Sequence, residues 1–188
     1  LGISDAENPD REARARADTL ELIKALVDAG ADVNAPMNVC RPLVSDLKTS
    51  AAYPLGIAMG LYVDGLHPEA LEAAKKLLEA GADVNGCLGV GPFPLVSTPL
   101  FSAALAIHRE LPDAFDVFRS ILAAGADPSE CALFPEGSEC PPLVELLHVL
   151  REGRVDRAET LAAIKSLLDA GADVRRQYPE VYCLEPHR

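Results

Sequence analysis

The chain has few aromatic residues, 5% of the total, and no tryptophan. It also lacks an apolar run near the roughly 20 residues that a membrane-spanning helix needs, so no membrane span is predicted. Basic residues are scarce, because 17 Lys and Arg stand against 29 Asp and Glu, for a net charge of −12. Proteins that bind nucleic acid draw their affinity from clustered Lys and Arg. We therefore expect no DNA or RNA partner. We interpret the acidity first as a solubility property, with a dedicated basic partner as the less favoured alternative.

The common signatures of catalytic and metal sites are missing as well. The sequence contains no G-x-G-x-x-G, G-x-x-x-x-G-K, H-E-x-x-H or G-x-S-x-G. It has no C-x-x-C pair, and its four histidines are dispersed without ligand spacing, which predicts neither a metal nor a cofactor. A catalytic Cys and His that meet only in space stay open, because sequence spacing does not show such pairs. The favoured interpretation is a protein that is not an enzyme.

The five cysteines are an odd number, so they cannot all pair within one chain. Four of them lie in or beside connections between predicted helices. Cys131 and Cys140 bracket one connection and could close it as a disulfide in an oxidising compartment.

Four segments of the chain end in nearly the same phrase. They are "ALVDAGADVN" ending at Asn34, "LLEAGADVN" at Asn85, "ILAAGADPS" at Ser129 and "LLDAGADVR" at Arg175. The residues three, four, seven and ten positions before each glycine are apolar, which predicts one buried face of a helix. Each glycine stands where the helix must end and where a left-handed backbone is cheap only for glycine. The predicted helix caps are Gly30, Gly81, Gly125 and Gly171.

A second signal precedes three of these helices. The segments "YPLGIAMGLY" from Tyr53, "TPLFSAALAI" from Thr98 and "PPLVELLHVL" from Pro141 each place a proline in a first helical turn. Each unit is therefore predicted to be two helices joined by a turn. Pro112 is expected to open the second helix of the third unit, and Asp156 to be the N-cap of the second helix of the last unit.

These features resemble the ankyrin repeat family. Its units carry a threonine-proline-leucine start, two antiparallel helices and a glycine-alanine-aspartate-valine-asparagine exit into a hairpin. Thr98, Pro99 and Leu100 match the start, and residues 30–34 and 81–85 match the complete exit. The departure is the spacing, since the glycines lie 51, 44 and 46 residues apart and the family period is about 33. A helical array of the HEAT type has a period nearer these values but does not call for the glycine turn.

The resemblance implies an all-α fold, namely an ankyrin-like solenoid of stacked helix-turn-helix units with long connecting loops. Residues 18–176 would form the repeat domain, with a capping segment or helix extension at 1–17 and a tail at 177–188. Solenoids of this kind usually present a surface to a partner. The resemblance therefore implies a noncatalytic, monomeric module that binds another protein through its insert loops and concave face. The alanine-rich composition and irregular repeats suggest a bacterial source.

The connecting segments 35–52 and 86–97 contain more apolar side chains than solvated loops need. They either pack on one another or await a partner, and the echo "PLVS" in both favours mutual packing. On the functional interpretation they form an apolar recognition patch. The residues expected to contact the partner are Met37, Val39, Leu88, Val90, Phe93, Leu95 and Phe134.

Other functions stay open beside this one. The chain could be the ankyrin-like portion or regulatory subunit of an enzyme, and a secreted effector or an immunity protein would look alike in sequence. The sequence starts at Leu1 without a methionine, which suggests that an upstream segment is missing. The location is then cytoplasmic or, if a signal peptide was removed, periplasmic or secreted.

Overall fold

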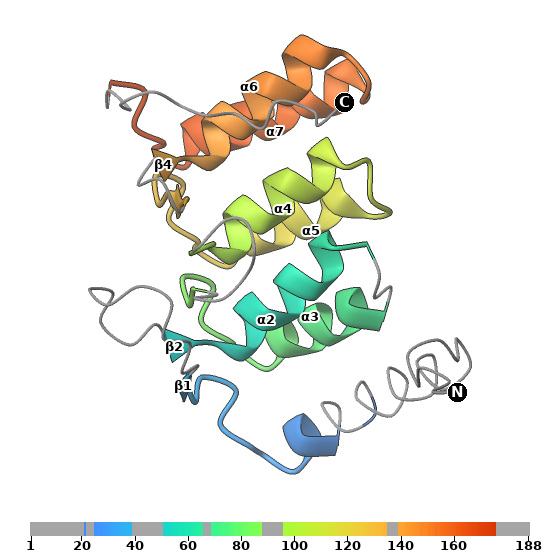
Figure 1. Cartoon of the computed structure of the whole chain (residues 1–188), viewed down its shortest axis with the longest axis vertical. Helices are drawn as coiled ribbons and strands as arrows, with labels where there is room; N and C mark the ends of the chain where they lie inside the picture. The colour runs from blue at the N-terminus through green and yellow to red at the C-terminus, as the bar shows by residue number, and fades with distance from the viewer. Residues whose placement is uncertain are drawn as a thin grey trace, which may run out of the picture.

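The computed structural model describes residues 21, 25–38, 51–65, 69–87, 96–134 and 139–175. In these residues the protein is mostly helical, with very little sheet (Figure 1). The helices are α2 (Pro54–Val63), α3 (Glu69–Glu79), α4 (Pro99–His108), α5 (Ala114–Ala123), α6 (Pro142–Glu152) and α7 (Arg157–Asp169). Residues 25–28 are also helical. The predicted capping segment 1–17 and the tail 177–188 lie outside the described residues.

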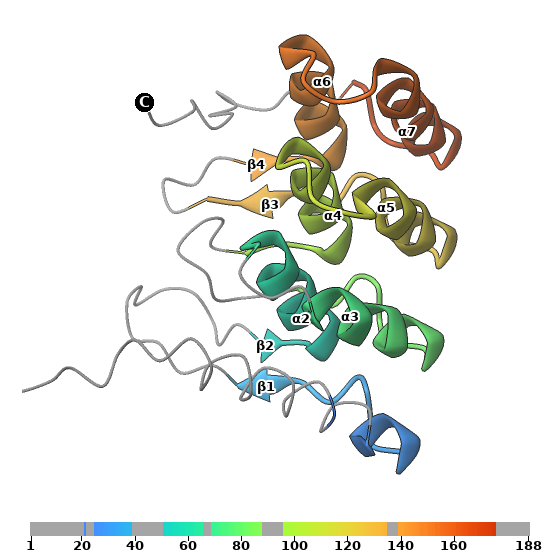
Figure 2. The same ribbon diagram turned by 90° about the vertical axis from the view of Figure 1, so that its right-hand side faces the viewer.

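The helices pack in pairs. Helix α2 packs on α3, α4 on α5, and α6 on α7, and the pairs contact one another through α2 with α4, α4 with α6, and α5 with α7. The three pairs follow one another along the long axis of the molecule (Figure 1). Figure 2 shows the first helices of the pairs side by side, the second helices on one side of them, and the short strands on the other.

The expectation of an all-α protein needs one correction, because the connections contain short antiparallel strands. These are β1 (Met37–Asn38), β2 (Ala51–Ala52), β3 (Ala132–Leu133) and β4 (Glu139–Cys140), with β1 paired to β2 and β3 to β4. Val96 joins the second pair, since it exchanges backbone hydrogen bonds of 3.0 and 2.9 Å with Leu133. The strand pairing provides hydrogen-bond partners for the backbone N–H and C=O groups of small buried residues such as Ala132.

Two helix starts follow directly from their local sequence. The Thr98 hydroxyl oxygen accepts a hydrogen bond of 3.1 Å from the backbone N–H of Phe101, and proline occupies the first turn of α4. At α7 the carboxylate of Asp156 accepts a bond of 2.8 Å from the backbone N–H of Glu159. Each cap satisfies an N–H that the helix itself leaves without a partner.

The start of α5 differs from the prediction. Pro112 does not open the helix, which begins two residues later at Ala114 after a left-handed N-cap, Asp113, with φ of 59°. The Pro112 carbonyl oxygen instead accepts a hydrogen bond from the Tyr62 hydroxyl of α2. Pro112 therefore lies outside the helix and contacts the preceding helical pair.

The helix ends follow the repeated phrase. The glycine of each exit phrase has a positive φ, and the N–H of the next alanine donates to the carbonyl oxygen five residues back, as from Ala82 to Leu77 at 2.9 Å. This pattern is the Schellman motif, which occupies the last free carbonyls of a helix. The glycines with this geometry are Gly30, Gly81, Gly125 and Gly171.

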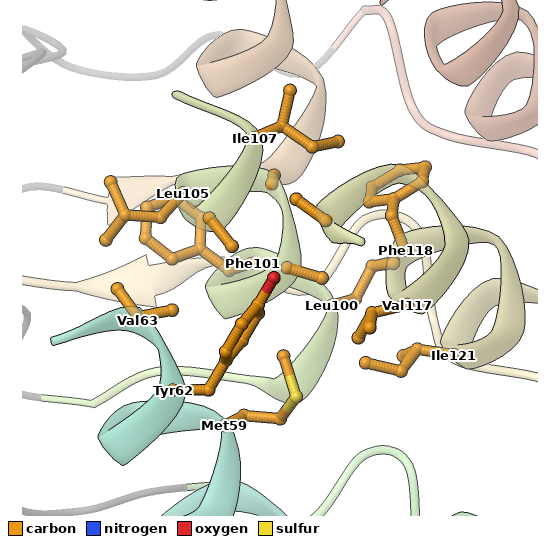
Figure 3. Packing of buried hydrophobic residues seen from close by; sticks show 14 of the residues in the cluster. Met59, Tyr62, Val63, Leu100, Phe101, Leu105, Ile107, Val117, Phe118 and Ile121 are labelled. Atoms are coloured by element: carbon orange, nitrogen blue, oxygen red, sulfur yellow. The ribbon is translucent and has the colours of Figure 1, made fainter. Parts of the chain in front are cut away.

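One hydrophobic core runs through the three pairs of helices. Its middle is shown in Figure 3, where Met59 and Tyr62 of α2, Phe101 of α4 and Phe118 of α5 come together with their neighbours. Burial of one such large apolar side chain stabilises a fold by about 1.5–3 kcal/mol. Because each pair shares this core with its neighbour, the pairs are not independent.

The last pair leaves apolar positions exposed that the earlier pairs bury. Leu161 is 44% exposed, whereas Leu71, which also lies ten residues before its capping glycine, is 8% exposed. Leu147 of α6 is 47% exposed, whereas the matching residues Ala104 and Met59 are completely buried. In the described part of the chain no helical pair follows α7, so nothing there covers these positions.

Candidate functional site

Each exit phrase folds into the same turn. The aspartate carboxylate accepts a hydrogen bond of 2.8 or 2.9 Å from the backbone N–H two residues later. Such a bond closes an Asx turn and fixes the direction in which the chain leaves the helix. The pairs are Asp32 with Asn34, Asp83 with Asn85, Asp127 with Ser129, and Asp173 with Arg175.

The last side chain of each turn then reaches the next unit. The bonds run from the N–H of Asp83 to Asn34 Oδ1 (2.6 Å), from Asp127 to Asn85 Oδ1 (2.8 Å), and from Asp173 to Ser129 Oγ (2.9 Å). We call these three bonds the turn ladder. Arg175 takes the same place in the last unit, and a guanidinium group has no acceptor for a further bond.

A cleft of about 560 Å³ lies beside the turn ladder. It is lined by Asn85, Asp127, Ser129, Glu130, Cys131, Leu133 and Glu139. These residues come from the exit turns of two successive units and from β3 and β4. The volume is in the range of clefts that accept small ligands or a few side chains of a partner. Among the residues that the structure describes, the lining holds three carboxylates and no basic residue.

The cleft is unfavourable for added negative charge. Burial raises the pKa of the Glu130 carboxyl group, and the nearby charges of Asp127 and Asp83 raise it further. Burial also raises the pKa of the Cys87 thiol, with smaller contributions from Glu130 and Asp83, and Cys87 Sγ lies 4.0 Å from Glu130 Oε1. A cysteine attacks as its thiolate, so this environment disfavours nucleophilic chemistry at Cys87. It favours a cationic group that would relieve the repulsion among the carboxylates.

Within the described ranges, no group of three or more His, Cys, Asp or Glu is arranged to hold a metal ion. In the same part of the chain, no helix has the length and apolar character to cross a membrane.

One of the predicted partner contacts is a core residue. Phe134 is only 5% exposed, and its ring packs edge-on against Phe101 with the ring centroids 6.3 Å apart. The Phe134 ring, which directly follows β3, lies in the core, where more of its apolar area is buried than would be at the surface. The other predicted contacts cannot be placed, because the side chain of Met37 and the whole of Val39, Leu88, Val90, Phe93 and Leu95 lie outside the described residues.

Cys131 and Cys140, considered as a possible disulfide for an oxidising compartment, are both thiols in the structure. Ala132 pairs directly with Cys140 across β3 and β4, so their side chains share the face that is buried in the core. Cys131 precedes Ala132 and lines the cleft, where its Sγ donates to the Ser129 carbonyl oxygen at 3.5 Å. The two sulfur atoms therefore lie on opposite sides of the hairpin, which the spacing of the two residues did not reveal.

The sequence also failed to indicate a polar cluster between α4 and α6. His108 Nδ1 contacts Glu145 Oε1, and His108 Nε2 lies 3.1 Å from Glu152 Oε2. The two glutamates are 37 and 44 residues away from the histidine, so no local spacing connects them. The one available signal was Glu145 itself, a charged residue in the buried stripe of a helix.

No family model matches the chain, and no curated protein is significantly similar to it. A function therefore has to be inferred from the packing of the units and from the cleft.

Proposed function

We propose that the protein is an ankyrin-like solenoid that binds a partner protein without catalysis. The observation that carries this proposal is the turn ladder, in which equivalent residues of successive units make equivalent bonds. Units that repeat in space as well as in sequence stack into an extended array, and such arrays present long binding surfaces. The threonine-proline-leucine start at Thr98 and the glycine exits support the ankyrin type of unit.

The binding surface proposed is the side of the molecule that carries the exit turns, the strands and the cleft. Figure 2 shows the strand pairs β1–β2 and β3–β4 on this side, away from the second helices. Both strand pairs lie in the long connections between successive units, and these units are longer than the ankyrin period. Insertions in repeat proteins gather on one face, which is often the face that binds.

The charge of the cleft indicates the kind of partner. Asp127, Glu130 and Glu139 line it, and no described lining residue is basic. Asp83 lies near enough to raise the pKa of Glu130. A partner that inserts a lysine or arginine side chain would meet a complementary potential and would be steered towards the cleft. The proposed ligand is therefore a protein segment with a basic side chain at its centre.

Selection from a displayed library of random peptides tests this function. Peptides that bind the wild-type protein are expected to be enriched in Lys and Arg, and their affinity should fall at least about tenfold in the variant Glu130→Gln with Glu139→Gln, since two charged contacts are removed. The matched control is Asp116→Asn with Glu159→Gln, which removes the same charge from the exposed starts of α5 and α7.

The control variant should bind the selected peptides as the wild type does. Equal binding by all three proteins would place the peptide elsewhere on the surface, and failure to select any basic peptide would contradict the proposed partner chemistry.

A further inference from the structure

Both ring nitrogens of His108 face carboxylate oxygens. Nδ1 contacts Glu145 Oε1, and Nε2 lies 3.1 Å from Glu152 Oε2. A neutral imidazole has one N–H donor and one acceptor nitrogen, so it can donate to one carboxylate only. The protonated ring donates from both nitrogens, and it is the form that fits this arrangement.

The contact joins two helical pairs. His108 is the last residue of α4, while Glu145 and Glu152 lie on the first and last turns of α6. The Glu145 side chain is only 3% exposed, and in the described residues His108 is the cation that contacts it. If the cationic partner is lost, the carboxylate becomes an uncompensated buried charge, which destabilises the packed arrangement around it.

One charged group near His108 shares a partner with it, because Arg154 contacts the same Glu152 Oε2 that the His108 ring faces, at 2.6 Å. On α6, His148 contacts Arg151, and just after α6, Arg154 contacts Glu152 and Glu110. On the side of α4 itself, the Arg109 guanidinium donates to the Val63 carbonyl oxygen.

The neighbouring helices α2 and α5 offer His108 no competing partner in the described part of the chain. The Tyr62 hydroxyl of α2 donates to the carbonyl oxygen of Pro112, and the Asp113 carboxylate at the start of α5 pairs with Lys75 at 3.3 Å. In the described residues Glu145 therefore depends on the proton on His108, whereas Glu152 keeps Arg154 as a cationic partner.

We propose that His108 is a proton-operated lock between the α4–α5 pair and the α6–α7 pair. The protonated ring holds the two carboxylates of α6 and keeps the last pair docked on the core. When the ring loses its proton, one nitrogen becomes an acceptor that faces a carboxylate oxygen, and the docking of α6 and α7 weakens. The device makes the end of the array responsive to pH in the range near neutrality.

The direction of the effect follows from the pKa of His108. The hydrogen bond to Glu145 raises this pKa, burial opposes the rise, and the charges of Glu145 and Glu152 add to it. A histidine whose pKa is raised by folding contributes its stability fully below its unfolded pKa of about 6.5, and that stability is lost as the pH rises through the folded pKa. Burial and Arg151 lower the pKa of His148, so its contribution has the opposite sign.

Amide hydrogen exchange at about pH 6 and about pH 9, corrected for the intrinsic rates, tests the lock. In the wild-type protein the protection of α6 and α7 should fall as the pH rises, by about tenfold for each unit by which folding raises the pKa of His108. The protection of α2 and α3 should change much less. His148→Gln, the matched control on α6, should keep the pH response, and His108→Gln should lose it.

The proposal is wrong if α6 and α7 of the wild-type protein are equally protected from exchange at both pH values. It is also wrong if the protection of these helices falls as much with rising pH in His108→Gln as in the wild type. Should that variant fail to fold, an NMR titration of the His108 ring in the wild-type protein gives an independent answer. A pKa at or below about 6.5 for this ring would overturn the proposal.

Discussion

At the scale of single residues, Asn85 belongs to two units at once. Its backbone N–H closes its own exit turn on Asp83, and its side-chain oxygen accepts the backbone N–H of Asp127 in the next unit. Asn85→Ala removes the second bond and leaves the first, so we expect the free energy of unfolding to fall by about 1 kcal/mol. Urea denaturation measures this change.

The control for this prediction is Arg175→Ala. Arg175 has the same place in the last unit, and its backbone N–H closes the turn on Asp173. Its side chain cannot extend the turn ladder, so the change in unfolding free energy should stay below about 0.5 kcal/mol. Equal losses in both variants would show that the turn ladder contributes nothing beyond local turn stability.

The Cys87 thiol provides a second prediction at this scale. Because burial raises its pKa and Glu130 and Asp83 add to the effect, little thiolate is present at neutral pH. We expect iodoacetamide to modify Cys87 more slowly than an unstructured cysteine, with a rate that still rises above about pH 8.5. Peptide mass spectrometry after timed labelling follows this one site among the five cysteines. A rate that levels off below that pH would contradict the pKa shift.

The residue-scale features that could be predicted from the sequence are those with local causes. Gly125 has to follow its helix because the backbone there has φ of 94°, and Asp156 caps a backbone N–H three residues away. The His108 cluster and the acidic cleft could not be predicted, because they depend on residues that meet only when successive units pack. Phe134 was misjudged for the same reason, since its ring finds Phe101 only after the hairpin folds back.

At the scale of helices, the same repeat position can be compared in a helical pair that is followed by another pair and in the last pair of the described residues. Leu71 on α3 is 8% exposed and Leu161 on α7 is 44% exposed, although both lie ten residues before their capping glycines. Leu71→Ala should lower the free energy of unfolding by about 2–5 kcal/mol, because it leaves a cavity in the core. Leu161→Ala should cost less than about 1 kcal/mol, since half of its side chain already meets solvent.

Denaturation of both leucine variants under one set of conditions gives the comparison. Similar losses would mean that α7 is covered in solution and that the exposed face described for the last pair is not free of contacts.

The existence of the helices could be predicted more fully than their connections. Proline in the first turn marks the starts of α4 and α6, and glycine after the last turn marks the ends of the helices that follow them. Apolar periodicity marks the buried faces of these helices. The resemblance implied a hairpin after each exit, but the positions of the strands were not predicted, because segments of two residues carry no periodic signal. The start of α5 was misplaced by two residues. Pro112 lies before a left-handed Asp113 and contacts Tyr62 of α2, and neither feature is marked in the local sequence.

At the scale of the whole molecule, the central claim is that successive helical pairs stack in one direction and share a core. The contacts of α4 with both α2 and α6, the single hydrophobic cluster and the turn ladder all agree with such an array. The array places the second helices in a row, as Figure 2 shows for α3, α5 and α7. The residues six positions before the capping glycines, Lys75, Arg119 and Lys165, then occupy equivalent places along this row.

Distances between spin labels at these positions test the claim most directly. Labels introduced through an unnatural amino acid leave the native cysteines in place. The first helices α2, α4 and α6 pack on one another, and packed helices lie about 8–10 Å apart. The separation between positions 75 and 165 should therefore be near 20 Å and about twice that between 75 and 119. If the separation between positions 75 and 165 equals that between 75 and 119, the helices surround a common centre and the account of a stacked array is wrong.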